Sequence, residues 1–433
     1  MTRPARKHEN RPLRPRPLAA LLALAAGCNA PEPPASTGGT DVPPGACGRG
    51  TAVVGTDYQS TNVSLVGVEG QVLSSSFLSS ATSSAGLAAP LSGDVAAPTM
   101  LAAGAEILLL DRYPAAVLTW VDVASATVRA QLNVSTGFAA NPQDYAKIST
   151  NKAYVSRYES NPAGGSEPFD AGSDLLIVDP TEPAVRGRVD LRGALEPAEA
   201  GFQPHPNRLV LIDGFAFVLL AAYSADYVQS APSRIVTIDA ATDQILGATR
   251  LEGLHGCAGL MVHPDGAELA VTCSGQFGGT TTPTLDSSAL VVLAVDRSGG
   301  APSPPTLTET ARIYAADLTA APLGFTVDFA PSGRILTTAM GQFGIAGAPD
   351  QPDQLLEVDP ATGETRVLRT GESLPFELGE VRCTLPCDSC FAADAERGVL
   401  ARYEPGADGW LALADEIVVD TAIGLPPRGL GRF

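Results

Sequence analysis

Two kinds of hydrophobic run alternate along this chain. Runs of the first kind end in an aromatic residue, and four of them occupy residues 53–58, 108–113, 153–158 and 218–223. Runs of the second kind end in an acid, namely Asp122, Asp179, Asp239, Asp296 and Asp359. These acids recur every 57 to 63 residues. A period of that size in a strand-rich chain is typical of the blades of a propeller.

Alternating runs between clusters of turn residues divide the chain into repeated units. In the unit at 202–253, we expect an inner strand at 209–212, a second at 215–222, a third at 234–239 and a last at 244–251. The pattern predicts an all-β fold, a seven-bladed β-propeller of four-stranded antiparallel blades over residues 51–433. The seven units lie near 51–80, 94–135, 141–193, 202–253, 256–318, 321–371 and 374–415.

Three features carry a resemblance to a known family. They are the segment 153–156 (Ala-Tyr-Val-Ser), the strand ends with a hydrophobic residue before Asp, and turns such as 359–364 (Asp-Pro-Ala-Thr-Gly-Glu). In these the chain resembles the YVTN-type β-propellers, seven-bladed bacterial relatives of the lactonase-like propellers. The resemblance spans about 51–433. It implies seven blades and permits a lactonase-like activity.

The first unit lacks an inner strand, because Cys47 is followed almost at once by material of a second strand. Residues 424–430 resemble the entry to an inner strand with no further strands after it. We therefore predict that the C-terminal strand joins blade one. This pairing would close the ring and remove its exposed sheet edges.

The N-terminal residues have the character of an export signal. A basic stretch precedes an apolar run at 18–26, which is too short to span a bilayer and ends at Gly27-Cys28. This end resembles a bacterial lipoprotein cleavage site, which implies lipidation of Cys28. We expect a signal peptide at 1–27, a lipidated Cys28 with a Pro-rich tether at 28–50, and an exported protein held on the outer membrane or the periplasmic face. An ordinary signal peptide is the alternative.

The formal net charge of the chain is −19. Residues 1–27 carry six basic side chains and one acidic side chain, so removing them leaves 22 basic against 46 acidic side chains, or −24. Such an excess of acid argues against binding to nucleic acid or to anionic lipid surfaces. We expect a monomer that contacts a membrane only through its lipid anchor.

Six cysteines remain besides Cys28, and an even number in an exported chain predicts three disulfides. Cys257 and Cys273 flank the turn at 263–266 symmetrically, and counting outward from it places them opposite each other. We therefore expect that bridge. The other four allow three pairings, and a bridge from Cys47 to the last blade would join the two ends of the propeller. A zinc site is the minor alternative for these four residues, which are Cys47, Cys383, Cys387 and Cys390.

Aromatic residues end the second strands of six blades. In a four-stranded meander, those strand ends share one face with the loops between blades, so the six rings should form a circle there. The same face carries the longest insertions, and loops on a rigid scaffold often carry function. We expect a ligand-binding face, although each ring could instead pack against the base of its own loop. The rings are Tyr58, Tyr113, Tyr158, Tyr223, Phe277 and Phe343.

The sequence contains none of four common motifs: a serine nucleophile elbow, a zinc-binding helix, a phosphate-binding loop or a dinucleotide-binding fingerprint. His255 precedes an inner strand and should lie near the channel mouth. With Asp226 and Asp286 it forms the weak candidate set for a metal-assisted site. His205 and His263 are each followed directly by Pro. We place both in turns between the first two strands of their blades. We expect no cofactor, with Ca²⁺ in the acidic loops as the alternative.

Together these features favour a lipid-anchored envelope propeller that acts as a non-catalytic binding or scaffolding module. Its ligand, an unknown protein or small molecule, is not specified by any motif. A lactonase-like hydrolase with a site at the channel mouth and an envelope-assembly component are the two alternatives.

Overall fold

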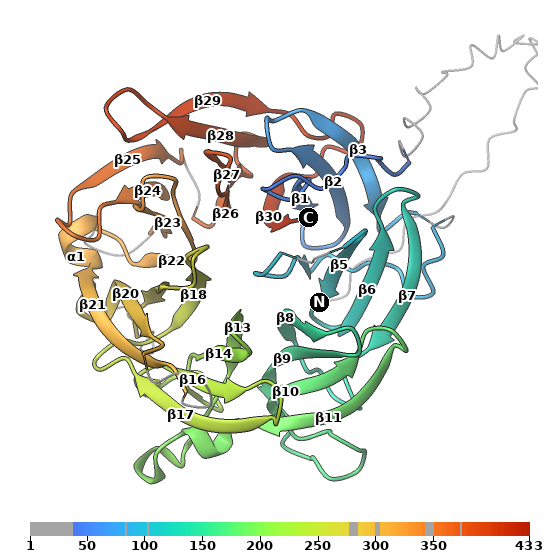
Figure 1. Cartoon of the computed structure of the whole chain (residues 1–433), viewed down its shortest axis with the longest axis vertical. Coiled ribbons are helices and arrows are strands. Elements are labelled where there is room, and N and C mark those ends of the chain that lie inside the picture. Colours follow the sequence, from blue (N-terminus) through green and yellow to red (C-terminus); the bar gives the residue numbers. More distant parts are fainter. Residues whose placement is uncertain are drawn as a thin grey trace, which may run out of the picture. The chain divides into compact units, whose positions relative to one another are not determined.

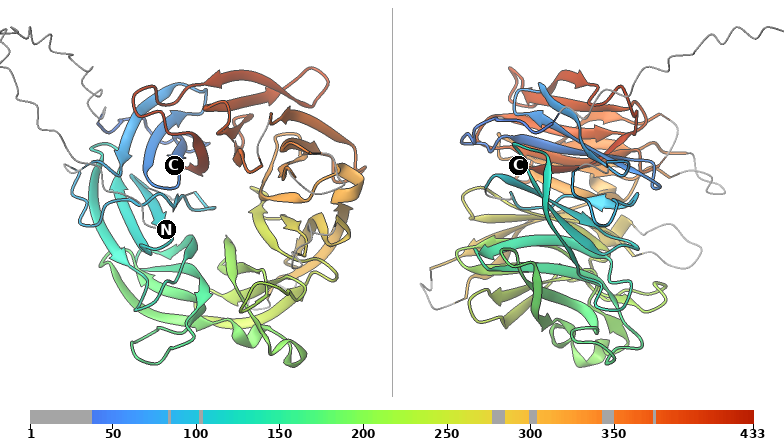
Figure 2. Two further views of the ribbon diagram at one scale, coloured as in Figure 1. Left: turned by 180° about the vertical axis from the view of Figure 1, so that it is seen from behind. Right: turned by 90° about the vertical axis from the view of Figure 1, so that its right-hand side faces the viewer.

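The computed structural model describes residues 38–82, 85–101, 104–276, 285–298, 304–342, 350–372 and 375–433. Over these ranges the chain forms seven four-stranded antiparallel sheets set around a central channel (Figure 1). Figure 2 shows the same ring from behind and from the side. The predicted seven-bladed β-propeller is confirmed. No helix among the described residues has the length and hydropathy needed to cross a membrane.

Each of the first four blades runs from an inner strand at the channel to an outer strand. Blade one is β30 (Pro427–Arg432), β1 (Gly50–Thr56), β2 (Thr61–Gly67) and β3 (Val72–Ser79). Blade two is β4 (Val95–Ala96), β5 (Glu106–Asp111), β6 (Val117–Asp122) and β7 (Thr127–Asn133). Blade three is β8 (Pro142–Ser149), β9 (Lys152–Ser160), β10 (Gly172–Asp179) and β11 (Ala184–Asp190). Blade four is β13 (Pro206–Ile212), β14 (Phe215–Leu220), β16 (Arg234–Asp239) and β17 (Gln244–Arg250).

The last three blades follow the same order. Blade five is β18 (Cys257–Val262), β19 (Glu268–Ser274), β20 (Ser288–Asp296) and β21 (Thr306–Tyr314). Blade six is β22 (Leu323–Phe329), β23 (Ile335–Ala339), β24 (Gln354–Val358) and β25 (Thr365–Thr370), and blade seven is β26 (Leu378–Thr384), β27 (Ser389–Asp394), β28 (Val399–Pro405) and β29 (Leu411–Ile417). The short strands β12 (Phe202–Gln203) and β15 (Tyr223–Ser224) pair beside blade four. The short helices are η1 (Arg192–Ala194), η2 (Pro197–Glu199), η3 (Leu285–Ser287) and α1 (Ala315–Leu318).

The hydrophobic runs form the middle strands of the blades. Strand β14 is buried at every position after Phe215, because neighbouring blades cover both faces of the sheet. The outer strand β17 is exposed or half-buried throughout, since it borders solvent. This burial gradient explains why continuous apolar runs, rather than strict alternation, mark the second and third strands.

The acid-ended runs have a structural explanation in the turns that follow them. A carboxylate oxygen of Asp239 accepts a hydrogen bond from the Ala241 backbone N–H at 2.8 Å, and Asp359 accepts one from Ala361 at 2.9 Å. A short acidic side chain that binds backbone two residues ahead stabilises a tight turn. The recurring acids therefore belong to the framework of the propeller.

The ring closes as predicted. Strand β30 pairs antiparallel with β1, placing Val53 opposite Leu430 and Ala52 opposite Gly431. The backbone N–H of Phe433 donates to the Gly50 carbonyl at 3.1 Å. The last residues of the chain thus supply the inner strand that blade one lacks, and Figure 1 shows the C-terminus beside that blade.

Three disulfides join the six cysteines of the described residues. Cys257 and Cys273 are bridged across β18 and β19, the pair that the hairpin register favours. Cys47 is bridged to Cys387, which joins the start of the propeller to its last blade. The third bridge links Cys383 to Cys390. These bonds leave none of the four cysteines 47, 383, 387 and 390 as a free thiolate for a zinc site.

The second half of the Pro-rich segment contacts the propeller. The backbone N–H of Thr40 donates to the Val123 carbonyl at 2.9 Å, and the side chain of Arg49 donates to the Gly104 carbonyl. The first half of the segment, the predicted signal peptide and the predicted lipidation site Cys28 lie outside the described residues.

Deletion of residues 421–433 should abolish cooperative folding, because β1 of blade one would be left with an unpaired edge and blade seven would lose the packing of β30 against β26 and β27. Thermal unfolding followed by circular dichroism tests this. The point variant Ile423→Ser, which changes an exposed side chain of the same segment, should melt like the wild type. A normal melting transition in the deletion variant would show that closure by β30 is dispensable.

Candidate functional site

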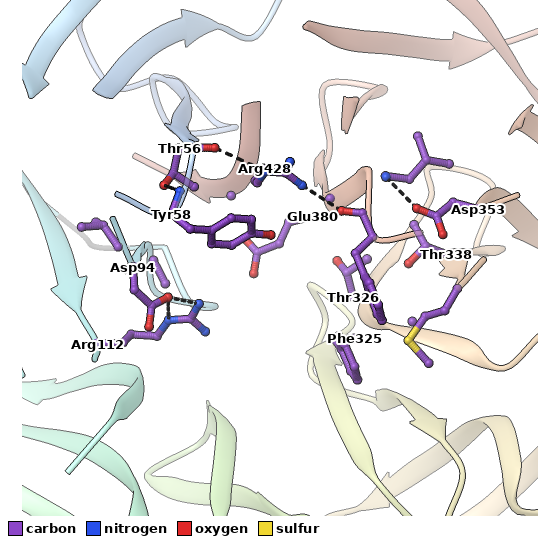
Figure 3. Close-up of a pocket in the computed structure, with 18 of the residues that line it drawn as sticks. Thr56, Tyr58, Asp94, Arg112, Phe325, Thr326, Thr338, Asp353, Glu380 and Arg428 are labelled. Carbon is purple, nitrogen blue, oxygen red and sulfur yellow. Dashed lines mark hydrogen bonds and ion pairs between the residues drawn. The ribbon is translucent and has the colours of Figure 1, made fainter. Parts of the chain in front are cut away.

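Two adjoining cavities open at one mouth of the central channel, where second strands end and inner strands begin. The first has a volume of about 280 Å³ and the second about 350 Å³. Asp94, Arg112, Arg208 and Phe325 line both, so the cavities are two halves of one site. Figure 3 shows the first cavity.

The first cavity, which we name the aromatic half, presents rings to solvent. Tyr58, Phe325 and Phe376 line it with 64%, 45% and 51% of their surfaces exposed. Phe325 and Phe376 are nearly parallel, at 3°, with ring centroids 6.4 Å apart. In Figure 3 the rings of Tyr58 and Phe325 lie on different sides of the cavity. Exposed aromatic rings in a concave site favour packing against a ligand.

The second cavity, which we name the polar half, is lined by amides and phenols. Asn141, Gln143 and Asn207 contribute amide groups, while Tyr158 and Tyr223 contribute rings. Burial raises the pKa of Tyr223 to about 12, and that of Tyr158 is raised as well, so both phenols stay protonated at neutral pH. This half therefore offers neutral hydrogen-bonding groups.

Two guanidiniums at the rim are held in place by carboxylates. Arg112 donates through Nε to Asp94 Oδ1 at 2.9 Å and through Nη1 to Gln143 Oε1 at 3.2 Å. Arg428 donates through Nη2 to both carboxylate oxygens of Glu377, at 3.1 and 3.2 Å. The Arg428 guanidinium also lies 4.9 Å from the ring centroid of Tyr58. Paired arginines of this kind lose little freedom when a ligand arrives.

The floor of the site contains an ion pair that spans the channel. Arg208 of β13 donates through Nη2 to Glu380 of β26, and these strands belong to blades four and seven, on opposite sides of the ring (Figure 1). Glu380 also accepts the backbone N–H of Leu430 at 2.8 Å, and Arg382 lies 3.5 Å from it. Burial opposes ionisation of Glu380, but Arg382 and Arg208 outweigh it and lower its pKa.

A second ion pair of the floor joins blades one and six. Arg432 of β30 donates through Nη2 to the two oxygens of Asp328, at 2.7 and 3.0 Å. Asp328 also accepts the backbone N–H of Cys383 at 2.9 Å. These contacts connect inner strands of three blades. The strand that closes the ring therefore also supplies charges to the channel.

The predicted circle of aromatic residues is found in part at this site. Tyr58 lines the aromatic half, and Tyr158 and Tyr223 line the polar half. Tyr113 is 57% exposed and lines neither cavity. Phe277 and Phe343 lie outside the described residues.

The three weak catalytic candidates each have local contacts of their own. Nδ1 of His255 lies 2.9 Å from the hydroxyl of Ser230, and burial lowers the His255 pKa. Asp226 accepts a hydrogen bond from Ser224 within its own loop at 2.6 Å, and Asp286 lies exposed in η3. Across the described residues, no group of three His, Cys, Asp or Glu side chains is arranged to hold a metal ion.

The position predicted for His205 from the sequence is wrong. His263 does lie in the turn between β18 and β19, but His205 directly precedes β13, at the mouth of the channel. Its ring is fully buried among tyrosines, with centroid distances of 4.6 Å to Tyr158, 5.0 Å to Tyr227 and 6.0 Å to Tyr223. The inner strand predicted at 209–212 already implied a position before that strand.

Some residues of the floor and of the aromatic half lie on inner strands. No sequence pattern indicated these residues. Arg208, Glu380 and Phe325 occupy the first few positions of β13, β26 and β22. The one signal in the sequence was their shared place near the start of an inner strand. Charged residues there are conspicuous because they face a narrow channel.

Comparisons with known proteins identify the fold. No family model matches the chain, and no curated protein matches its sequence. A protein from Bacteroides fragilis provisionally assigned as a 6-phosphogluconolactonase is 13% identical, with a TM-score of 0.54 over 88% of this chain and 97% of that one. A second such protein, from Bacteroides uniformis, is 15% identical, with a TM-score of 0.53 over 88% and 98%. A protein from Lactobacillus plantarum is 12% identical, with a TM-score of 0.51 over 88% and 98%.

The buried His205 should make stability depend on pH. Burial lowers its pKa from 6.5 to about 4, so the unfolded chain binds more protons between these values. The free energy of unfolding should therefore fall as the pH drops from 6.5 to 4, by up to about 1.4 kcal/mol per pH unit from this group.

Urea unfolding of the wild type and of His205→Asn across this range measures the effect. Asparagine tolerates the positive φ of 47° at this position. The variant should start less stable, because it loses ring packing, and should show a smaller slope with pH. Equal slopes in the two proteins would contradict the assignment.

Proposed function

We propose that this protein is an exported β-propeller that binds a small organic ligand at the channel mouth without transforming it. The observation that carries the proposal is the aromatic half. Three exposed rings, Tyr58, Phe325 and Phe376, line a cavity of about 280 Å³ together with arginines that already have fixed positions. Concave sites with apolar walls and a few oriented polar groups are typical of small-molecule binding.

The carboxylates of the mouth favour binding over catalysis. Asp94, Glu377 and Glu380 each accept hydrogen bonds from an arginine. The lowered pKa of Glu380 makes it a weak base, whereas an effective general base needs a pKa near the working pH. These groups orient guanidiniums toward the cavity, which is a role in recognition.

Export and anchoring to the bacterial envelope are part of the proposal. Three disulfides support folding in an oxidising compartment, because cytosolic proteins rarely keep such bonds. The sequence around Cys28 supports a lipid anchor at that residue. Mass spectrometry of the N-terminus from membranes should give a lipid-modified Cys28, and an unmodified N-terminus at another residue would rule the anchor out.

A lactonase-like hydrolase is the second candidate. It is favoured by the shared fold with two proteins provisionally assigned as 6-phosphogluconolactonases. An identity of 13–15% extends to the fold alone. The same channel mouth would then have to activate water against a lactone carbonyl.

The binding proposal is tested with the purified protein and a panel of small organic acids, sugars and lactones, screened by thermal shift and then by titration calorimetry. Phe325→Ala should weaken binding of any hit by about tenfold to a hundredfold, because a buried aromatic contact is lost. Tyr113→Ala is the matched control, since Tyr113 is an exposed ring that lines neither cavity.

Three outcomes are distinguishable. Binding that depends on Phe325 and not on Tyr113, with the ligand recovered intact, supports the proposed function. Release of the open-chain acid from a lactone, lost in Phe325→Ala, supports the second candidate instead. Equal losses in the two variants would place the ligand elsewhere.

A further inference from the structure

In the floor of the channel mouth, two arginines surround one carboxylate. Glu380 is shared by Arg208, which donates to it, and by Arg382, whose Nη2 lies 3.5 Å away. Both arginine side chains are largely enclosed, with 12% and 3% of their surfaces exposed. Two largely enclosed guanidiniums thus share this one carboxylate.

Two further carboxylates, Asp144 and Asp328, also act on these arginines. Asp144 directs its oxygens to backbone N–H groups, those of Thr99 and Leu209, each at 2.9 Å. Burial raises the Asp144 pKa, although Arg208 opposes the shift. Burial also lowers the pKa of Arg382; Arg208 and Arg432 lower it further, while Glu380 and Asp328 oppose the shift. Crowded cations of this kind attract an anion.

Unpaired donors point in the same direction. Within the described residues, Arg208 Nη1, Arg382 Nε and Arg432 Nε are buried and have no hydrogen-bond partner. All three are donors, so the groups that would satisfy them are acceptors. Of these three arginines, Arg208 is the one that lines the two cavities, so its guanidinium is the one that a ligand in either half would contact.

We propose that the ligand of this site is a small carboxylic acid with an aromatic or alicyclic ring, bound through a carboxylate–Arg208 contact and through packing of its ring on Phe325. This inference rests on the proposed function and specifies its ligand. A guanidinium–carboxylate hydrogen bond is about twice as strong as a neutral one and matches the donor left free. The exposed rings of the aromatic half supply the apolar surface that the other end of the ligand requires.

A monoanion suits the site better than a phosphate dianion. The carboxylates of Asp94 and Glu380 border the same cavity and would repel a second negative charge. Arg208 Nη2 is engaged by Glu380, and Nη1 is its buried nitrogen without a hydrogen-bond partner. The volume of about 280 Å³ limits the ligand to a compact molecule.

The test is titration calorimetry of the full-length protein with benzoate and cyclohexanecarboxylate, against benzamide as the neutral analogue of equal shape. Inorganic phosphate and 6-phosphogluconate serve as phosphate probes. Both carboxylates should bind, benzamide should bind at least about tenfold more weakly, and neither phosphate probe should displace benzoate.

The variants separate recognition from folding. Arg208→Gln should remove the preference for benzoate over benzamide, and Arg208→Lys, which keeps the charge across the channel, should retain part of it. Arg192→Gln is the matched control, because Arg192 is an exposed arginine paired with Asp190. A circular dichroism melt of each variant shows whether it folds. If Arg208→Gln does not fold, saturation-transfer NMR on the wild type and Phe325→Ala decides whether benzoate uses this cavity.

Several results would overturn the inference. Benzamide binding as tightly as benzoate would remove the role of the negative charge, and displacement of benzoate by 6-phosphogluconate or phosphate would assign the site to phosphate esters. If no carboxylate binds while another panel compound binds in a Phe325-dependent way, the inference fails and the proposed function stands. If nothing binds at Phe325, both fail.

Discussion

The pairing of β30 with β1 is the constraint on which the rest of the structure depends. Without it, blade one would be a three-stranded sheet with an unpaired inner edge, and blade seven would lose the strand that packs against β26 and β27. The same strand carries Arg428 to the rim and Arg432 to the floor, and the Leu430 N–H binds Glu380. Closure of the fold and assembly of the site therefore depend on the same strand.

Burying charged side chains in the channel costs free energy of folding, and the packing of the blades does not account for their presence. Arg157 and Asp174 show how a buried pair can be fully satisfied: their side chains are wholly enclosed at 2.7 Å, and Arg157 also binds the Val134 carbonyl and the Thr136 hydroxyl. Arg208 instead keeps one buried nitrogen unpaired beside a cavity. A buried nitrogen without a partner costs free energy of folding, and at Arg208 a ligand in the adjoining cavity would supply the missing acceptor.

The sequence predicted what depends on local pattern. The spacing of Asp239, Asp359 and their equivalents located the blades, the missing first strand located the closure, and the hairpin register paired Cys257 with Cys273. It could not predict contacts that the ring creates. Arg208 and Glu380 are 172 residues apart and meet only because blades four and seven face each other across the channel. The Pro after His205 resembles a turn signal and predicts the wrong position for this residue, whereas strand β13, which begins at that Pro, fixes it.

The repeat predicts where the functional site lies. The chemistry of the site comes from residues that differ from one repeat to the next. Tyr58 and Tyr113 end equivalent strands, yet one lines the cavity and the other does not. The aromatic half draws its exposed rings from blades one and six and from the segment before blade seven, whereas the amides of the polar half come from blades three and four and the segments before them. A ring of similar blades presents equivalent positions all around one mouth. Binding specificity then arises where their side chains differ, because only an asymmetric mouth can orient an asymmetric ligand.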